Sequence, residues 1–375
     1  MPKKTISKAY NPEVDFWKFI FAVFIALFHS RKMLPGYIYF SRGYILVDFF
    51  FMVSGYFLAV KVRSGLEKDI KTPTSEFLSH KIKSLYKVCF AAFLIAFFGR
   101  EIVEGMTAKE MTNDFVLSFF ENSFTRPFGL TVGKYYNGPT WYISAMLVAM
   151  AMIYPLAVKF KRPFMRAACP IISGFCYGYI FKTVGYLNVA ETTTLSFVQY
   201  SLIRAFAGLC LGCFINECCA VLKEKTAGFS VTKAGNAVFA VLEFTFLSWI
   251  IAFAVVSERM RWPRKYDFFM VIVVAAFCFI VFSELTGIKE KLSGKDFGIL
   301  SKLSLYLYLN HRVITRIILK YMSDKPYYIV FPCYIGFIIC SMLLCRLLVF
   351  LFDLFSKHVA PKLKNLMFKA LPDEA

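Results

Sequence analysis

The sequence predicts an all-α fold, in which about ten transmembrane helices form a polytopic bundle. Of the 375 residues, 58% are hydrophobic and only 18% are charged, a balance typical of chains buried in lipid. The apolar residues gather in long runs, and most Lys and Arg residues lie between these runs. No linker, repeat or low-complexity stretch divides the chain, so we expect residues 1–375 to form a single domain.

Ten apolar runs mark the expected helices in chain order: residues 12–30, 44–60, 84–98, 140–158, 168–185, 198–220, 236–257, 267–283, 300–320 and 327–353. Several runs are shorter than the ~20 residues that a helix needs to cross a ~30 Å hydrocarbon core. Their flanks must therefore continue the helix, or the helices must lie in protein-lined depressions. The first run follows a basic N-terminus but contains Lys18 and lacks a small-residue cleavage site, so we expect it to remain as a helix.

The charges outside the runs favour a cytoplasmic N-terminus. With ten spans, the segments facing the cytoplasm are 1–10, 61–83, 159–166, 221–235, 284–302 and 354–375. They hold 24 Lys and Arg residues, against 14 in the five external segments. The positive-inside rule therefore predicts that both termini face the cytoplasm. We expect the protein to lie in the cell membrane, plasma or inner. An external cluster of Arg259, Arg261, Arg264 and Lys265 opposes this rule.

Composition also argues against other classes of protein. The formal net charge is +20, but the Lys and Arg residues lie between apolar runs, as in membrane proteins, and do not cover one face of a soluble domain. We therefore expect membrane lipids as partners and no nucleic acid. The eleven Cys residues show no metal-ligand spacing, and most lie inside apolar runs, where a thiol behaves as a small hydrophobic group. We expect neither a metal site nor a disulfide framework.

The first expected helix carries two ionisable residues on one face. Lys18 and His29 are eleven residues apart, which at 100° per residue is three turns plus ~20°, or roughly 16 Å along the axis. Ionisable groups inside a membrane are costly and mark candidate functional sites. A neutral imidazole suits the removal of a hydroxyl proton near pH 7, which makes His29 a candidate general base. In the plainer interpretations, Lys18 pairs with Asp15 and His29 extends to the membrane surface.

The second expected helix contains Asp48 among aromatic residues, followed by Ser54 and Gly55, a small pair that permits close helix packing. A buried carboxylate needs a partner, and His29 or Lys18 would serve. A carboxylate behind an imidazole fixes the tautomer of the ring and stabilises its protonated form, so we expect Asp48 to orient His29. A purely structural pair between helices is the alternative.

The ninth expected helix places Ser304, Tyr308 and His311 on one face at helical spacing. Such a face is typical of the wall of a pore or binding site, although Tyr and His also gather where helices meet the membrane surface. Arg204 and Glu243 are further charged residues within expected helices, and a functional, an anchoring or a packing role fits them equally.

These residues resemble the membrane-bound acyltransferase-3 family over most of the chain. The first helix of the family carries a basic residue, ten intervening residues and a His, as Lys18 and His29 do here. Its second helix reads V-D-x-F-F-x-x-S-G, which is similar to residues 47–55. Its basic entry to the third helix resembles residues 77–87, although Lys81 and Lys83 stand where the family has Arg. Lys neutralises phosphate but lacks the bidentate fork of Arg.

Later motifs of the family resemble this chain as well. The W-F-L opening of a middle helix looks like the segment that begins at Trp141, and the late S-Y-x-x-Y-L-x-H motif looks like residues 304–311. Arg204, followed by Gly208 and Gly212, fits a Gly-rich helix of the family. Many relatives carry an extra soluble esterase-like domain, whereas residues 354–375 are too few for one, so we expect none here.

The resemblance implies an integral membrane O-acyltransferase. It would move an acyl group, most often acetyl, from cytoplasmic acetyl-CoA or another acyl-CoA to a hydroxyl of a cell-surface or exported polysaccharide. We assign the roles by residue: catalysis to His29, Lys18 and Asp48, CoA binding to Lys81 and Lys83, and substrate binding to Trp141, Tyr308, His311 and Arg204.

A transporter of the same fold, for a small or lipid-linked molecule, is the alternative function. Buried Lys18, Asp48, Glu243 and His311 would then line a permeation route without chemistry. A purely structural or sensory protein leaves the clustered Lys18, His29 and Asp48 unexplained. Hydrolysis of acyl-CoA, or transfer of a labelled acyl group, by the purified protein separates the enzyme from the transporter.

Overall fold

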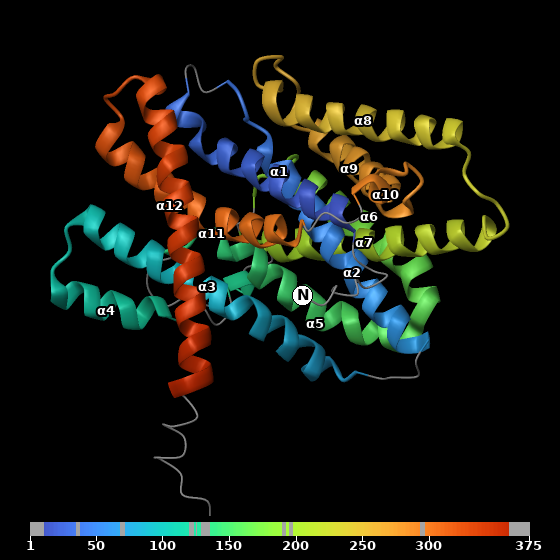
Figure 1. Cartoon of the computed structure of the whole chain (residues 1–375), viewed down its shortest axis with the longest axis horizontal. Helices are drawn as coiled ribbons and strands as arrows, with labels where there is room; N and C mark the ends of the chain where they lie inside the picture. Colours follow the sequence, from blue (N-terminus) through green and yellow to red (C-terminus); the bar gives the residue numbers. More distant parts are fainter. Residues whose placement is uncertain are drawn as a thin grey trace, which may run out of the picture.

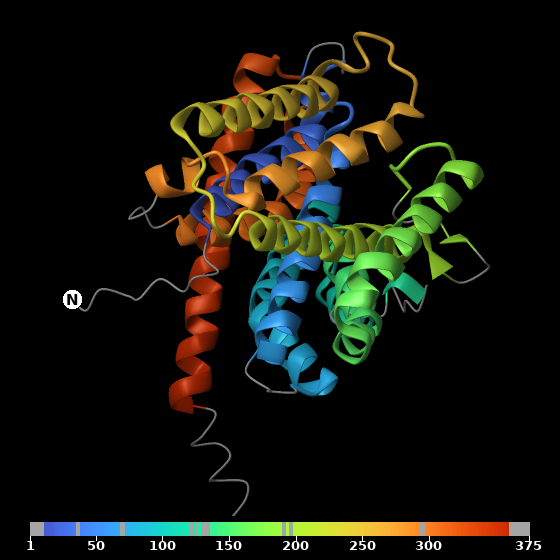
Figure 2. The same cartoon turned by 90° about the vertical axis from the view of Figure 1, so that its right-hand side faces the viewer.

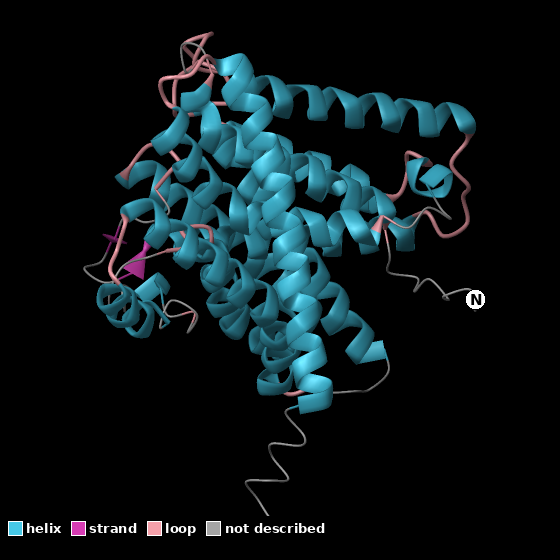
Figure 3. Ribbon diagram, turned by 60° about the vertical axis from the view of Figure 1, so that its left-hand side comes forward, coloured by secondary structure: helices cyan, strands magenta, loops and turns pink. Residues whose placement is uncertain are grey.

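Helices make up nearly all of the described part of the chain in the computed structural model (Figure 3). The structure describes residues 11–34, 38–67, 72–119, 124, 126–128, 136–189, 193–194, 198–292 and 297–359. Within these residues, two short strands, β1 (Thr193–Thr194) and β2 (Val198–Gln199), pair antiparallel beside the helices. The prediction of an all-α fold is confirmed.

Each of the ten predicted runs lies on a long helix (Figure 1). These helices are α1 (Pro12–Ser30), α2 (Leu46–Glu67), α3 (Thr74–Glu104), α5 (Thr140–Pro163), α6 (Cys169–Thr183), α7 (Tyr200–Lys225), α8 (Lys233–Val256), α9 (Tyr266–Ser283), α11 (Gly298–Met322) and α12 (Tyr327–Leu354). The shortest predicted run, 84–98, continues on both flanks as α3, so a helix of 31 residues replaces a run too short to span. Two short helices, α4 (Ala108–Phe119) and α10 (Ile288–Leu292), lie between the long ones.

Seven helical stretches in the described residues are long and apolar enough to cross a membrane. One of them covers both α5 and α6, which are joined through η6 (Phe164–Ala168) and interrupted at Lys161, where φ is 53°. The helices α1 and α11 lie outside these seven. The helix α1 carries three charged residues, Glu13, Asp15 and Lys18, and α11 is made less apolar by polar residues such as Asn310 and His311. The chain is a polytopic membrane protein, and charged residues lie within its long helices α1 and α11.

The helices α8 and α12 lie on the outside of the bundle and expose apolar side chains. Figure 1 shows α12 crossing in front of α3, and α12 packs on both α3 and α11. Figure 2 shows α8 lying over α9. These outer helices expose large apolar side chains, such as Phe244 at 53% and Leu347 at 51%. Because water disfavours such a surface, we assign these faces to lipid.

The central contact is between α2 and α7, whose backbones touch at glycines. A Cβ atom at Gly55 would lie 2.0 Å from the carbonyl oxygen of Leu209, and one at Gly212 would lie 2.0 Å from that of Met52. Any side chain would force the two helices apart, so small residues here permit the close packing that the sequence predicted. This approach brings Asp48 on α2 to Arg204 on α7.

Candidate functional site

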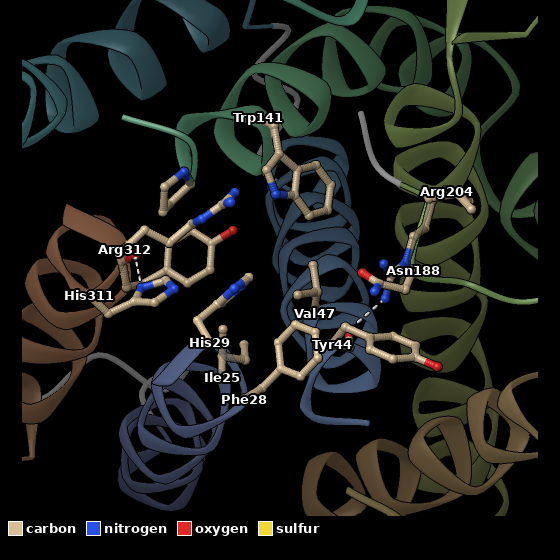
Figure 4. Close-up of a pocket in the computed structure, with 13 residues that line it drawn as sticks. Ile25, Phe28, His29, Tyr44, Val47, Trp141, Asn188, Arg204, His311 and Arg312 are labelled. Atoms are coloured by element: carbon tan, nitrogen blue, oxygen red, sulfur yellow. Dashed lines mark hydrogen bonds between the residues drawn. The ribbon is translucent and has the colours of Figure 1, made fainter. Parts of the chain in front are cut away.

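A cavity of about 340 Å³ lies between the central helices, and we call it the histidine cavity. Figure 4 shows His29, His311 and Arg312 gathered on one side of it and Arg204 and Asn188 on the other. Its walls are formed by Ile25, Phe28, His29, Tyr44, Val47, Pro139, Trp141, Asn188, Val189, Arg204, Tyr308, His311 and Arg312. Five of these positions were singled out from the sequence.

Two histidines from different helices face each other in this cavity. His29 lies near the end of α1 and His311 lies within α11, and these helices pack side by side. Their ring centroids are 4.9 Å apart, with 36° between the ring planes. The sequence marked both residues as candidates, but it did not predict that they form a pair.

The tautomer of His311 follows from its surroundings. Its Nδ1 lies 2.6 Å from the backbone carbonyl oxygen of Tyr308, and because a carbonyl only accepts hydrogen bonds, Nδ1 carries the hydrogen. Nε2 is then left with a lone pair. This atom is buried and has no hydrogen-bond partner among the described residues. An unsatisfied buried acceptor beside a second imidazole is a natural place for a substrate hydroxyl or a moving proton.

A second cavity of about 220 Å³ adjoins the first, and we call it the lysine cavity. Both cavities are lined by Val47 and Tyr308. The lysine cavity is lined by Lys18, Val47, Phe50, Ser54, Lys81, Ser84, Leu85, Tyr142, Ile143, Met146, Ser301, Ser304, Leu305 and Tyr308. One face of α11 thus contributes Ser304, Tyr308 and His311 to the two cavities in turn, as its helical spacing predicted.

The two cavities follow each other along α1. Lys18, near the start of α1, faces the lysine cavity, and His29, near its end, faces the histidine cavity. Lys18 also pairs with Asp15 at 3.0 Å, so the structural pairing considered for it is present together with its place in the cavity wall. Where the cavities meet, the rings of Tyr142 and Tyr308 lie 5.7 Å apart, nearly at right angles.

Asp48 pairs with Arg204 and Tyr177, and the expected partnership with His29 or Lys18 was wrong. Nη2 of Arg204 lies 2.6 Å from one carboxylate oxygen of Asp48, and its Nε donates to the other at 3.2 Å. The Tyr177 hydroxyl donates to Asp48 at 2.7 Å. Burial explains this choice, because a carboxylate that is 0% exposed is best stabilised by a guanidinium that is itself buried. The partner of His29 is His311 instead.

The Arg204 guanidinium donates hydrogen bonds to several groups of the protein. Besides Asp48, it donates to the backbone carbonyl oxygens of Leu187 at 2.9 Å and Tyr44 at 2.7 Å. Its side chain therefore fixes α2, α7 and the segment after α6 relative to one another. The substrate-binding role predicted for Arg204 remains a hypothesis, although the residue lines the histidine cavity.

A second buried ion pair, which the sequence analysis missed, supports the same region. Arg42 donates to Asp267 at 2.9 Å, and the Tyr44 hydroxyl and the Leu187 backbone N–H also donate to this carboxylate. Tyr44 and Leu187 thus connect the Asp48–Arg204 pair with the Asp267–Arg42 pair. The only sequence signals were an acidic residue at the start of α9 and a basic residue in an external segment.

The predicted CoA-binding lysines separate in the structure. Lys81 lines the lysine cavity, whereas Lys83 is exposed and lies outside its walls. Trp141 lines the histidine cavity, and its role in substrate binding stays a prediction. Arg312 was not considered from the sequence, yet it follows His311 directly and lines the same cavity.

The arrangement can take a proton from a hydroxyl and hold a negative charge as it develops. The paired imidazoles supply the base, and Arg312 supplies a cation in the same cavity. The serines, tyrosines and lysines of the lysine cavity offer hydrogen bonds and positive charge to an elongated polar ligand. Two connected spaces of this kind suit a reaction between two substrates.

Comparison with known proteins adds one positive finding. The acyltransferase-3 family model, described as an acyltransferase domain, matches residues 11–350, nearly the whole chain. Neither the curated proteins nor the solved structures give a match.

Proposed function

Since the chain belongs to the acyltransferase-3 family, we propose that this membrane acyltransferase moves an acetyl group from cytoplasmic acetyl-CoA to a hydroxyl of a cell-surface or exported polysaccharide. The observation that carries the proposal is the pair His29–His311, with ring centroids 4.9 Å apart where two cavities adjoin. Each cavity receives one substrate, so the donor and the acceptor meet at the histidines.

The lysine cavity takes the donor. Lys18 and Lys81 offer two ammonium groups to the phosphates of CoA, and Ser54 and Ser84 offer hydroxyls along the same wall. Phe50 contributes an apolar surface next to them. With the predicted topology, the lysine end of α1 lies toward the cytoplasm, where acyl-CoA is available.

The histidines carry out the proton transfers. His29 removes the proton of the acceptor hydroxyl while its oxygen attacks the thioester carbonyl carbon. The carbon–sulfur bond then breaks, and the CoA thiolate takes up the proton, so that the products are an ester and free CoA. His311 accepts a hydrogen bond at Nε2 and holds His29 or the hydroxyl in place. Arg312 stabilises the negative charge on the tetrahedral intermediate.

Asp48 acts at a distance in this scheme. Its ion pair with Arg204 fixes Tyr44, whose ring lines the histidine cavity, and the α2–α7 contact. Asp48 is therefore a positioning residue here, and the catalytic role assigned to it from the sequence is replaced. A covalent acyl group on His29 would need the same neutral imidazole, and trapping of a labelled acyl-enzyme would reveal that route.

Radiolabelled acetyl-CoA supplied to membranes tests this proposal. Wild type should label the cell-surface glycan, and His29→Ala should lose transfer by about 10² to 10⁴ fold, the usual contribution of a general base. His358→Ala is the matched control, because His358 is an exposed histidine after α12 and lines neither cavity. Wild-type transfer by His29→Ala at equal protein abundance would overturn the proposal. A transporter would release no CoA with either variant.

A further inference from the structure

The external arginine cluster, which opposes the positive-inside rule, adjoins the candidate site. A third cavity of about 330 Å³ lies there, and we call it the arginine cavity. Arg264 from the cluster lines it together with Arg31, which follows His29 by two residues, and Arg42. Because external basic residues are disfavoured by membrane topology, their gathering around a cavity calls for a local reason.

The arginine cavity continues the histidine cavity. Both are lined by Tyr44 and Asn188, so the two spaces share one wall. The lysine, histidine and arginine cavities therefore form one series, with His29 in the middle cavity. A ligand that extends from the arginine cavity reaches the histidines from the side opposite the lysine cavity.

The walls of the arginine cavity carry an excess of positive charge. Three guanidinium groups line it, from Arg31, Arg42 and Arg264, against one carboxylate, Glu258. The charge of Arg42 is compensated by Asp267 at 2.9 Å, which leaves Arg31 and Arg264 facing Glu258. The space accordingly favours an anion.

The two remaining arginines are supported in ways that keep their charge. The Arg31 guanidinium donates to the backbone carbonyl oxygen of Ser41 at 3.3 Å and lies 4.9 Å from the centre of the Phe28 ring. The Arg264 guanidinium lies 5.0 Å from the centre of the Tyr186 ring. Neither carbonyl nor ring neutralises a cation, and both hold the guanidinium in a defined place. Carboxylates and phosphates are the groups that such arginines bind best.

We propose that the arginine cavity extends the acceptor site of the histidine cavity and that the acceptor is a glycan bearing an anionic group, a carboxylate or a phosphate, next to the sugar that is acylated. This inference rests on the proposed function for the identity of the acceptor, while the anion site itself stands on the geometry. The anionic group is held by Arg31 and Arg264, and the neighbouring sugar hydroxyl reaches His29. Tyr186 and Asn188 offer a ring face and an amide to the sugar.

Binding of small sugar probes to the whole protein tests the site without any acyl donor. The protein is placed in nanodiscs of phosphatidylcholine, and affinity is measured by thermal stabilisation. The probes are methyl β-glucoside, methyl β-glucuronide and methyl β-glucoside 6-phosphate. Both anionic probes should bind about tenfold or more tightly than the neutral one, as expected for a charge-assisted hydrogen bond.

Three variants assign this preference to the cavity. Arg264→Gln should lower the affinity for the anionic probes about tenfold and leave the affinity for the neutral probe unchanged. Glu258→Gln should raise the affinity for the anionic probes, because it removes the negative charge of Glu258 from the cavity wall. Arg261→Gln is the matched control, since Arg261 is an exposed arginine of the same segment that does not line the cavity. Equal effects of Arg264→Gln and Arg261→Gln would overturn the proposal.

A measurement in anionic lipid tells whether the anionic group that occupies the cavity belongs to a glycan or to a lipid. If nanodiscs containing phosphatidylglycerol stabilise wild type but not Arg264→Gln, and anionic sugars add nothing, the occupant is a lipid headgroup and the acceptor proposal is wrong. A protein that transfers no acyl group but still discriminates anionic sugars refutes the proposed function alone. Transfer to glycans with no preference between charged and neutral probes refutes the acceptor proposal alone.

Discussion

Replacement of Gly212 by Ala is predicted to destabilise the protein through the α2–α7 contact. The added Cβ would lie 2.0 Å from the Met52 carbonyl oxygen and 2.8 Å from the Tyr56 backbone nitrogen. Real Cβ contacts are essentially never shorter than 3.0 Å, so the helices must separate by about 1 Å at this point. Because both neighbours are backbone atoms, no change of rotamer relieves the clash.

The magnitude follows from two opposing effects. Overpacking of this kind costs about 1 to 3 kcal/mol and occasionally more. Replacement of Gly by Ala in a helix gains at most about 1 kcal/mol from propensity. We therefore expect Gly212→Ala to lose about 2 kcal/mol of stability. The same separation strains the Asp48–Arg204 pair, where 2.6 Å separates the charged atoms, so acyl transfer should fall as well.

Thermal unfolding of the purified protein in detergent measures this loss, with acyl transfer as the second readout. Gly174→Ala and Gly178→Ala are matched controls, because no atom lies within 4 Å of the position that their Cβ would take on α6. These controls should be neutral or stabilised by up to about 1 kcal/mol. Equal melting temperatures for Gly212→Ala and Gly174→Ala would refute the close approach of α2 and α7.

Three further predictions concern the site. Asp48→Asn should lower the free energy of unfolding by about 3 to 5 kcal/mol, because it leaves the buried Arg204 cation without a counter-charge. The Asp48→Asn/Arg204→Gln double variant should recover part of this loss in thermal unfolding, and an Asp48→Asn variant as stable as wild type would contradict the pairing. His311→Ala should lower kcat for acyl transfer about 10² fold while the KM for acyl-CoA changes little, and unchanged kcat would exclude its part in proton transfer. Lys81→Ala should raise the KM for acyl-CoA most at low salt, and Lys18→Arg should be tolerated; the reverse order would argue against a role for their charge.

The helices could be predicted because their signal is local. Ten apolar runs lie on ten long helices, and even the run at 84–98, too short to span, pointed to its own extension as α3. The face of α11 with Ser304, Tyr308 and His311 also followed from spacing alone, since residues three and four apart adjoin on a helix.

The partners across helices could not be predicted in the same way. Asp48 meets Arg204, which is 156 residues away, and Tyr177, which is 129 residues away, and neither distance leaves a pattern in the sequence. Only the packing of α2 against α7 decides that Asp48 faces a guanidinium and not an imidazole. The pairing of His29 with His311 is equally a product of helix packing.

The separation of the two predicted CoA-binding lysines follows from helical geometry. Lys81 and Lys83 were assigned together to CoA binding because both match a basic motif. At 100° per residue they point about 200° apart on α3, so they face nearly opposite directions. The structure places Lys81 in the wall of the lysine cavity and exposes Lys83 outside it.

Acyl transfer across sealed membrane vesicles tests the central claim most directly. Inside-out vesicles carrying wild type or His29→Ala receive radiolabelled acetyl-CoA on the outside, and label is measured in the glycan enclosed within. We predict labelled glycan inside wild-type vesicles and none above background with His29→Ala at equal protein abundance. Equal labelling by the two proteins would contradict the assignment of acyl transfer to the histidine pair.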